Sequence, residues 1–185
     1  MAGKEAYPEG ERVVLKKVAV AMSGGVDSAV AALLLRESGH EVVGVTMCLG
    51  VAPAAGEGAK CCGPREIDDA GRICRTLGIR HYVVDFASEL EEKVIRPFVE
   101  AYCRGRTPNP CVACNRSIKF GSLLDRVRAW GFDGIATGHY AAIAEENGRH
   151  RLTTPRDRRK DQTYFLYGIP REALEQVLFP LAEVT

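Results

Sequence analysis

The sequence KVAVAMSGGVDS, at Lys17–Ser28, joins a short apolar run to two glycines flanked by hydroxyls and an aspartate. The run Val18–Ala21 has no polar interruption, which suits a strand that is buried on both faces of a parallel sheet. Val26–Leu35 has the apolar content of a helix. Between them, Gly24 and Gly25 allow a tight turn and a close backbone approach to a ligand. We therefore predict a strand, a glycine turn and a helix.

An anion would lie at the N-terminus of this helix, because unpaired backbone N–H groups and the positive end of the helix dipole meet it there. The hydroxyls of Ser23 and Ser28 add hydrogen-bonding groups. The loop has no lysine directly before Ser28, so it is not the GxxxxGK[ST] loop that holds β and γ phosphates. The pattern favours a pyrophosphate-holding loop, and a tight turn without a ligand is the other interpretation of the glycines.

Strand-like and helix-like runs alternate through most of the chain. The predicted strands are Lys17–Met22, Glu41–Met47, His81–Asp85 and Gly134–Thr137, and the predicted helices are Val26–Ser38, Arg65–Leu77, Ser88–Arg104 and Arg116–Trp130. This alternation predicts a parallel sheet covered by helices, which binds ligands at the carboxyl ends of its strands. Pro97 lies inside the third helix, where we expect a kink or a break.

The last part of the chain follows a different pattern. Tyr140–Glu145 and Arg149–Thr154 flank an Asn-Gly turn and predict a hairpin. Asp161–Ile169 resembles a helix, and the closing segment, 169–185, predicts one short amphipathic helix and an apolar tail. The basic cluster that could hold a phosphate backbone consists of Arg151, Arg156, Arg158, Arg159 and Lys160.

The length of 185 residues suits one α/β domain, residues 1–185, with an irregular lead at 1–15 and a loop at 51–63. Hydrophobic residues make up 46% and charged residues 26%, and no apolar run approaches the roughly 18 residues of a membrane span. The N-terminus lacks the apolar core of a signal peptide, so we expect a cytoplasmic location and no membrane partner. The net charge of +1 argues against a chain coated in positive charge.

The cysteines are odd in number, which argues against a disulfide framework in a chain that we expect to be cytosolic. Cys74 lies in an apolar helical pattern and is most simply a core residue. The others require catalysis, metal binding or burial as an explanation. The seven are Cys48, Cys61, Cys62, Cys74, Cys103, Cys111 and Cys114.

The sequence GRTPNPCVACNRSIKFG, at Gly105–Gly121, is the second candidate site. Its two prolines favour an extended path and exclude a helix until about Asn115, so we expect Cys111 and Cys114 on a rigid loop or at a helix start. Thiols near a helix N-terminus and several cations should ionise more easily. The Cys-x-x-Cys spacing leaves open a redox dithiol, half of a zinc site, an inert structural pair, and sulfur or iron-sulfur chemistry, which we favour.

The segment SGGVDS resembles the signature of the ATP pyrophosphatase group. Together with GRTPNPCVACNRSIKFG, it makes the chain similar to the tRNA-specific 2-thiouridylase family, which replaces the C2 oxygen of the wobble uridine in certain tRNAs with sulfur. Further matches follow the family's order along nearly the whole chain: VVGVTM, the pair Cys61 and Cys62, YVVDF, ATGHYA, KDQTYFL and LFPLAE. The resemblance implies a Rossmann-like, doubly wound parallel sheet of the ATP pyrophosphatase (adenine nucleotide alpha hydrolase) type.

For ATP, the resemblance implies a set of contacts around the glycine turn. The residues that would contact the phosphates are Ala21, Met22, Ser23, Gly24, Gly25, Val26, Asp27 and Ser28. Met47 and Gly138 would border the adenosine, and Asp27 would act near the pyrophosphate through magnesium. We favour a packing or capping role for His139 over a general-base role, because adenylation of a carbonyl oxygen requires little proton transfer.

For the second substrate, the resemblance places Cys114 at the nucleophile position. Asn109, Pro110 and Cys111 would lie beside the target base, and Lys160, Asp161 and Gln162 match a tRNA-contacting motif. A solvated helix cap is the other interpretation of that motif.

Many relatives carry aspartate where Cys111 stands, and cysteine there can mark chemistry in which Cys111 and Cys114 ligate a 4Fe–4S cluster. The family's third cysteine belongs to a central domain that we expect, with the C-terminal domain, to be absent from this chain. Cys103 or Cys61 would be local substitutes.

The leading hypothesis is the N-terminal catalytic domain of a tRNA uridine 2-sulfurtransferase. It would use ATP and magnesium, act on tRNA, and receive sulfur from a cysteine desulfurase or a relay carrier. The rivals are another adenylating ATP pyrophosphatase, which leaves the cysteine sequence unexplained, and a nucleotide-binding module without thiolation activity.

Overall fold

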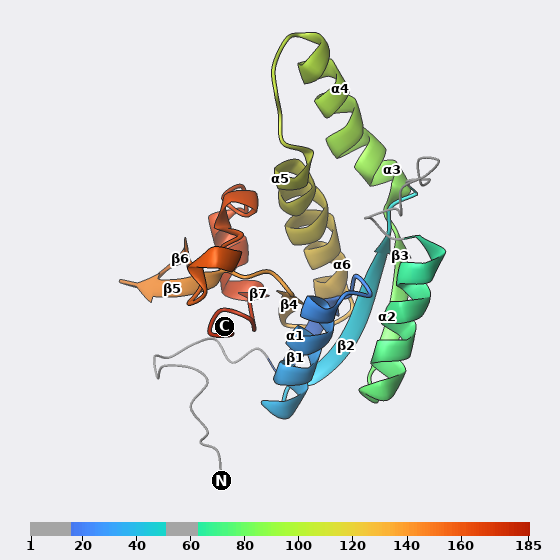
Figure 1. The fold of residues 1–185 in the computed structure, drawn as a ribbon, viewed down its shortest axis with the longest axis vertical. Helices are drawn as coiled ribbons and strands as arrows, with labels where there is room; N and C mark the ends of the chain where they lie inside the picture. The colour runs from blue at the N-terminus through green and yellow to red at the C-terminus, as the bar shows by residue number, and fades with distance from the viewer. Residues whose placement is uncertain (1–15, 51–62) are drawn as a thin grey trace.

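The computed structural model describes residues 16–50 and 63–185, and its centre is a parallel sheet with helices around it (Figure 1). The strand order is β3-β2-β1-β4-β7, and every pairing in this sheet is parallel. The strands are β1 (Lys17–Ala21), β2 (Glu41–Cys48), β3 (Arg80–Asp85), β4 (Gly134–Thr137) and β7 (Val177–Leu178). From β1 the chain adds β2 and β3 on one side and then β4 and β7 on the other, so the strand order reverses between β1 and β4. Parallel sheets of this kind bind ligands at such a switch point.

Helices cover both faces of the sheet, so the predicted doubly wound fold is confirmed. Val18 and Val20 of β1 pack on one face with α1 (Val26–Glu37) and α2 (Pro64–Thr76). Ala19 packs on the other face with the helices that follow β3. Successive strand residues point to opposite faces, which explains why β1 is apolar throughout. Cys74 is fully buried on the inner face of α2, as predicted, and burial raises the pKa of its thiol.

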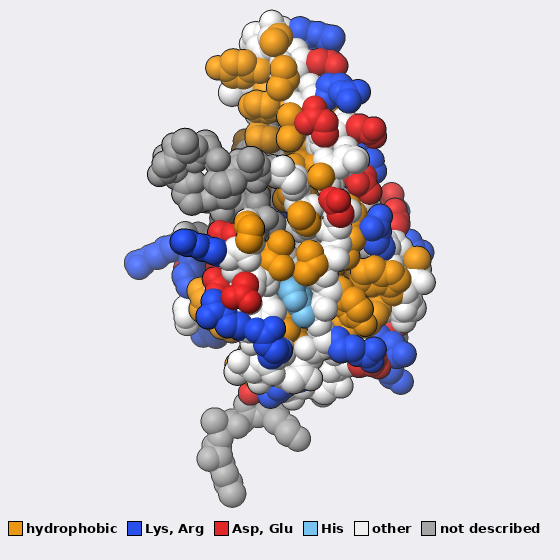
Figure 2. All heavy atoms as spheres, turned by 90° about the vertical axis from the view of Figure 1, so that its right-hand side faces the viewer, with side chains coloured by type: hydrophobic (Ala, Val, Ile, Leu, Met, Phe, Trp, Pro, Cys, Tyr) orange, Lys and Arg blue, Asp and Glu red, His pale blue; other side chains and the backbone are white. Residues whose placement is uncertain are grey.

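Two long helices on the second face of the sheet each contain a π-helical stretch between two α-helical stretches. The first consists of α3 (Ala87–Leu90), a π-helical stretch η1 (Glu91–Ile95) and α4 (Arg96–Cys103). The irregularity expected at Pro97 is therefore the π-helical stretch directly before it, since proline has no N–H for the regular ladder. α4 projects beyond the body of the protein, and Figure 2 shows hydrophobic side chains along it, where Val99 and Tyr102 are exposed.

The second long helix begins earlier than predicted. It consists of α5 (Pro110–Cys114), a π-helical stretch η2 (Asn115–Leu123) and α6 (Leu124–Ala129). The expectation that helix is excluded until about Asn115 is wrong, because Pro110 occupies the first helical turn, where its missing N–H is not needed.

The C-terminal part contains the predicted hairpin, β5 (Ala142–Glu146) and β6 (Arg149–Thr153). The predicted helices after it are wrong. The chain instead forms short 3-10 turns: η3 (Arg158–Lys160), η4 (Thr163–Phe165) and η5 (Arg171–Gln176), and then adds β7 to the sheet beside β4. Figure 1 shows this orange-to-red segment between the hairpin and α5.

Some expectations lie outside the described residues: the lead at 1–15, most of the loop at 51–63, and the pair Cys61 and Cys62. Among the helices that the structure describes, none has the length and apolar character needed to cross a membrane.

Candidate active site

The loop between β1 and α1, together with the first turn of α1, forms the phosphate cradle (residues 21–28). The Ser28 hydroxyl donates to the carbonyl of Gly25 at 2.9 Å and accepts from the Ser23 backbone N–H at 3.3 Å. The Ser23 hydroxyl lies 3.3 Å from that of Ser28. Ser28 is buried, so its hydroxyl shapes the loop, whereas Ser23 is exposed at its surface.

Gly24 and Gly138 fix the backbone of the cradle. Gly24 has φ +78°, and a Cβ there would lie 2.7 Å from the carbonyl oxygen of Glu66. Gly138 follows β4, and a Cβ there would lie 2.6 Å from the backbone nitrogen of Ser28. The end of β4 therefore lies directly against the first turn of α1, and only glycine permits this approach.

The remaining cradle residues occupy two environments. Met22 is buried and donates its backbone N–H to Val45 at 2.8 Å, which ties the end of β1 to β2. Val26 and Asp27 are exposed in the first turn of α1, where a carboxylate or a bound anion is favoured by the helix dipole. Met47 is buried near the carboxyl end of β2, on the same edge of the sheet.

Cys111 and Cys114 lie on α5, which we call the cysteine helix. Asn109 is its N-cap, and its Oδ1 accepts from the backbone N–H of Cys111 at 3.0 Å and of Val112 at 3.4 Å. The two cysteines are three positions apart on a helix, so their side chains share one face. Cys111 is exposed and Cys114 is half-buried. The expectation that their thiols ionise easily stays a prediction.

A row of contacts joins the phosphate cradle to η2, the continuation of the cysteine helix, through His139, the residue after Gly138. The His139 ring lies 6.3 Å from the rings of Phe120 and Phe179. Phe120 belongs to η2, which continues the cysteine helix. The two sequence motifs, about 80 residues apart, therefore belong to elements that are linked through His139, on the side of the sheet where ligands bind in this class of fold.

His139 is a structural residue of this row. Its Nδ1 lies 2.7 Å from the Thr137 hydroxyl. Burial, together with the charge of Lys119, lowers the pKa of His139 to about 3. A ring that stays neutral at pH 7 and holds a proton so weakly is a poor general base, which supports the packing role.

The motif Lys160–Gln162 packs on Tyr140, which the sequence analysis did not single out. Lys160 Nζ donates to the Tyr140 hydroxyl at 3.1 Å and lies 4.6 Å from the ring centre. Gln162 accepts from the Tyr140 backbone N–H and donates its own N–H to the Tyr140 carbonyl, both at 2.9 Å. The Asp161 carboxylate accepts from the backbone N–H and the hydroxyl of Thr163, so Asp161 closes a turn directly before η4.

This packing places Lys160 close to the phosphate cradle. The hydrogen bond to Tyr140 is the main reason that the pKa of Lys160 is raised, and the charges of Asp157 and Asp27 act in the same direction. The charges of Lys160 and Asp27 are thus close enough to interact, although the two side chains form no ion pair among the described residues. Contact with tRNA remains a prediction for these three residues.

Asn115 is a second site residue that the sequence analysis missed. Its side chain is buried, donates to the Phe165 carbonyl at 2.9 Å, and accepts from Lys119 Nζ at 2.9 Å. It ties the segment around η4 to the cysteine helix. Its place directly after Cys114 was the only signal in the sequence.

The cysteines do not complete a cluster site within the part of the chain that the structure describes. No three His, Cys, Asp or Glu side chains gather there in a way that could hold a metal ion. Cys111 and Cys114 therefore supply at most two thiolates from the described residues, whereas a 4Fe–4S cluster requires more.

The switch-point cradle, the doubly wound sheet and the thiols at its carboxyl edge define an α/β nucleotide-binding domain of the HUP class. Residues 16–185 match the family model described as the tRNA methyl transferase HUP domain. The chain belongs to this family.

Curated relatives of the chain carry the name tRNA-specific 2-thiouridylase. One from Syntrophus aciditrophicus is 55% identical over 99% of this chain and 49% of its own length. Another from Pelotomaculum thermopropionicum is 52% identical over 91% of this chain and 48% of its own length. The chain thus spans about half the length of the curated relatives it matches.

A solved structure shows the same fold. The crystal structure of a predicted tRNA methyltransferase subunit from Methanocaldococcus jannaschii aligns with a TM-score of 0.53 at 20% identity. The alignment covers 92% of this chain and 70% of that chain.

Proposed function

We propose that this chain forms the ATP-binding and thiol-bearing part of a tRNA uridine 2-sulfurtransferase. The row of contacts from the phosphate cradle through His139 to Phe120, on the helix that continues from Cys111 and Cys114, carries the proposal. A site that activates a carbonyl oxygen with ATP and then exchanges it for sulfur requires a nucleotide cradle and a thiol-bearing element that are held in a fixed arrangement. The family and the named relatives support the same activity.

The first step takes place at the phosphate cradle. The C2 oxygen of the wobble uridine attacks the α phosphorus of ATP, pyrophosphate departs, and the uridine carries AMP on that oxygen. The N–H groups at the start of α1 stabilise the negative charge on the departing pyrophosphate. Asp27 is exposed there, and one carboxylate with phosphate oxygens is the ligand set that magnesium prefers. Met47 and Gly138 border the adenosine.

The second step takes place at the cysteine helix. A sulfur atom attacks the activated C2 carbon, and AMP leaves with the original oxygen. Cys114 bears this sulfur as the outer atom of a persulfide, which a cysteine desulfurase or a relay carrier supplies. After the attack on C2, a thiol reductant breaks the S–S bond to Cys114, so that the outer sulfur stays on C2 and the Cys114 sulfur forms a disulfide with that thiol. Asn109, Pro110 and Cys111 lie beside the target base, and Lys160, Asp161 and Gln162 contact the tRNA. Because the described residues do not complete a cluster site, we derive no step through one.

Mass spectrometry of tRNA incubated with the chain, ATP, magnesium, a thiol reductant, and a cysteine desulfurase with cysteine as the persulfide donor tests this function. We expect a gain of sulfur at the wobble uridine with the wild-type chain, a loss of more than about 100-fold with Cys114→Ser, and no loss with Cys103→Ser. Cys103 is the matched control because its thiol is exposed on α4, outside the site. ATP binding without any modification would contradict the function and indicate a nucleotide-binding module.

An iron count after anaerobic purification separates the two sulfur routes. A colourless, iron-free protein that thiolates tRNA uses a persulfide. A protein that loses activity in step with its iron uses a cluster, with ligands beyond the described residues.

A further inference from the structure

A groove of about 1150 Å³ lies between the hairpin β5–β6 and the segment that holds η4 and η5. We call it the aromatic groove. The lining residues that matter here are Arg149, Arg151, Tyr164, Leu166, Tyr167 and Arg171. Neither the phosphate cradle nor the cysteine helix contributes to its lining, and the proposed chemistry gives it no role.

The tyrosines of the groove face solvent. Tyr164 is 65% exposed and Tyr167 is 69% exposed, and their ring centres lie 6.1 Å apart. Phe165 is also partly exposed, 5.5 Å from the Tyr164 ring. Three neighbouring aromatic rings that contribute little to the core offer flat apolar faces, which suit stacking against planar rings.

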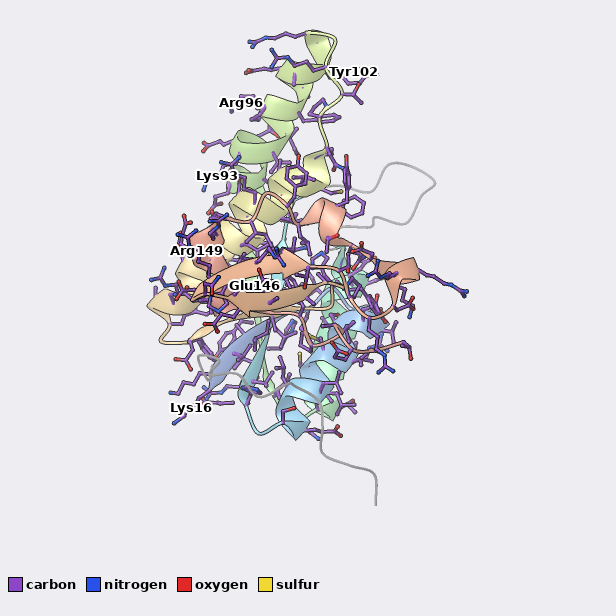
Figure 3. All side chains as sticks on the ribbon, turned by 90° about the vertical axis from the view of Figure 1, so that its left-hand side faces the viewer. Lys16, Lys93, Arg96, Tyr102, Glu146 and Arg149 are labelled. Carbon is purple, nitrogen blue, oxygen red and sulfur yellow. The ribbon has the colours of Figure 1, made fainter. Side chains whose placement is uncertain are left out.

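The rim of the groove carries more positive than negative charge. Arg149, Arg151 and Arg171 line it, and Glu146 is the one acidic residue among its lining residues in the described chain. Glu146 forms an ion pair with Arg151 at 2.7 Å, which leaves the charges of Arg149 and Arg171 for a partner. Figure 3 shows Glu146 and Arg149 on the hairpin.

The segment that carries the tyrosines of the aromatic groove packs against the cysteine helix. The Phe165 carbonyl accepts a hydrogen bond from Asn115, the residue after Cys114. A Cβ on Gly168 would lie 3.3 Å from the Val112 side chain, so the chain just after Tyr167 packs directly on α5. A polynucleotide whose target base lies at Cys114 would therefore have its neighbouring nucleotides beside these aromatic rings.

We propose that the aromatic groove binds unstacked bases of the tRNA next to the target uridine, with Tyr164 and Tyr167 as stacking platforms and Arg149 and Arg171 as phosphate contacts. This rests on the proposed function. Stacking of splayed-out bases on tyrosine, with arginine on the backbone, is the ordinary way in which proteins hold single-stranded loops of RNA. The excess of arginine over acidic side chains favours RNA over a protein segment as the occupant.

The test measures binding of an RNA stem-loop that has an anticodon-loop sequence with a wobble uridine and 2-aminopurine beside it. We expect Tyr164→Ala to weaken binding by about 5- to 100-fold and to abolish the quenching of 2-aminopurine fluorescence, and Tyr164→Phe to restore both. Arg149→Gln should weaken binding and reduce its salt dependence. Tyr102→Ala is the matched control, because Tyr102 is also 65% exposed but lies on α4, away from the hairpin (Figure 3).

The outcomes separate the inference from the proposed function. If the wild-type chain binds the RNA and Tyr164→Ala binds it equally well, the groove has another occupant, such as a protein segment, and the inference fails alone. If the wild-type chain binds ATP but no RNA, both fail. Equal losses in Tyr164→Ala and Tyr102→Ala would also overturn the inference, since exposure alone would then explain the effect.

Discussion

The phosphate cradle and the segment from η3 to β7 both border the candidate site, but different interactions hold them in place. The cradle rests on backbone contacts: Gly24 against Glu66 and Gly138 against Ser28, with no room for a Cβ. The later segment rests on side-chain hydrogen bonds, from Asn115 to Phe165 and from Tyr140 to Gln162. Substitutions should therefore distort the first region sterically and loosen the second one locally.

The largest effect should come from Asp27→Ala in the cradle. We expect the release of pyrophosphate that depends on tRNA to fall by about 100- to 1000-fold, because magnesium would lose its carboxylate ligand and the departing pyrophosphate would lose the cation that neutralises it. Stability should change by less than about 1 kcal/mol, since Asp27 is exposed. A coupled phosphate assay and a thermal melt measure the two. Glu37→Ala, at the other end of α1, is the control, and retained release in Asp27→Ala would contradict the cradle's role.

Gly138→Ala should have the next largest effect, and it should lower both the free energy of unfolding and the affinity for ATP. The new Cβ forces β4 and the first turn of α1 apart, which we expect to cost about 1–3 kcal/mol in the free energy of unfolding. ATP affinity should fall with it. Denaturant unfolding and calorimetric ATP titration measure these. Gly25→Ala is the control for stability, because a Cβ there meets only the Ser23 hydroxyl at 3.4 Å; an equal loss in both variants would argue against the close approach at Gly138.

Asn115→Ala should act on the other region. Losing a buried side chain that makes two hydrogen bonds should cost about 1–3 kcal/mol, and it leaves the Phe165 carbonyl without this donor. Hydrogen exchange should accelerate at the amides of Phe165 and Leu166 while the amides of β1 keep their protection. Ser122→Ala, which removes a more exposed hydroxyl of the same helix, is the control. Uniform acceleration across the sheet would contradict a local tie.

The smallest effect concerns pH. The folded pKa of His139, about 3, lies below the ordinary value of 6.5, so the unfolded chain binds more protons between these values. The neutral ring's contribution to stability is present above pH 6.5 and is lost as pH falls toward 3. We expect the wild-type chain to lose about 1–2 kcal/mol from this group between pH 7 and 5. The His81 ring, whose pKa is also lowered, acts in the same direction.

Comparing His139→Phe with the wild-type chain isolates the His139 contribution, because His81 is present in both. Urea unfolding at pH 7 and pH 5 measures it, and the variant should have the shallower pH dependence. Equal slopes in both proteins would place the titration elsewhere.

The same contrast explains what could be predicted from sequence. The strands of the cradle region and its first two helices were predicted to within one or two residues, because apolar runs and glycines act locally there. β7 was missed because its two residues become a strand only by pairing with Ile135 and Ala136, far away in the chain. The helix predicted at Asp161–Ile169 is broken into turns by contacts with Tyr140 and Asn115, which no local pattern shows. The early start of the cysteine helix was missed because Pro110 was interpreted as a barrier rather than a first-turn residue.

The site residues implied by family resemblance lie at the carboxyl edge of the sheet or on the elements packed there, but their roles require experiments. Neither Tyr140 nor Asn115 could be selected from sequence, because their partners are distant in the chain. Asn115 bonds the Phe165 carbonyl, 50 residues away, and the Tyr140 backbone N–H bonds Gln162, 22 residues away. The exposed pair Tyr164 and Tyr167 likewise looks apolar in sequence, and only the structure leaves it facing solvent.

The central claim, that the phosphate cradle and the cysteine helix act in sequence on one uridine, has a direct test in the Cys114→Ser variant. The variant is incubated with tRNA and ATP labelled at the α phosphorus or, separately, at the γ phosphorus. The account predicts that α label accumulates on the tRNA, at the wobble uridine, while γ label leaves with pyrophosphate. A wild-type chain that thiolates tRNA, beside a Cys114→Ser variant that places no α label on it or thiolates at the normal rate, would contradict the account.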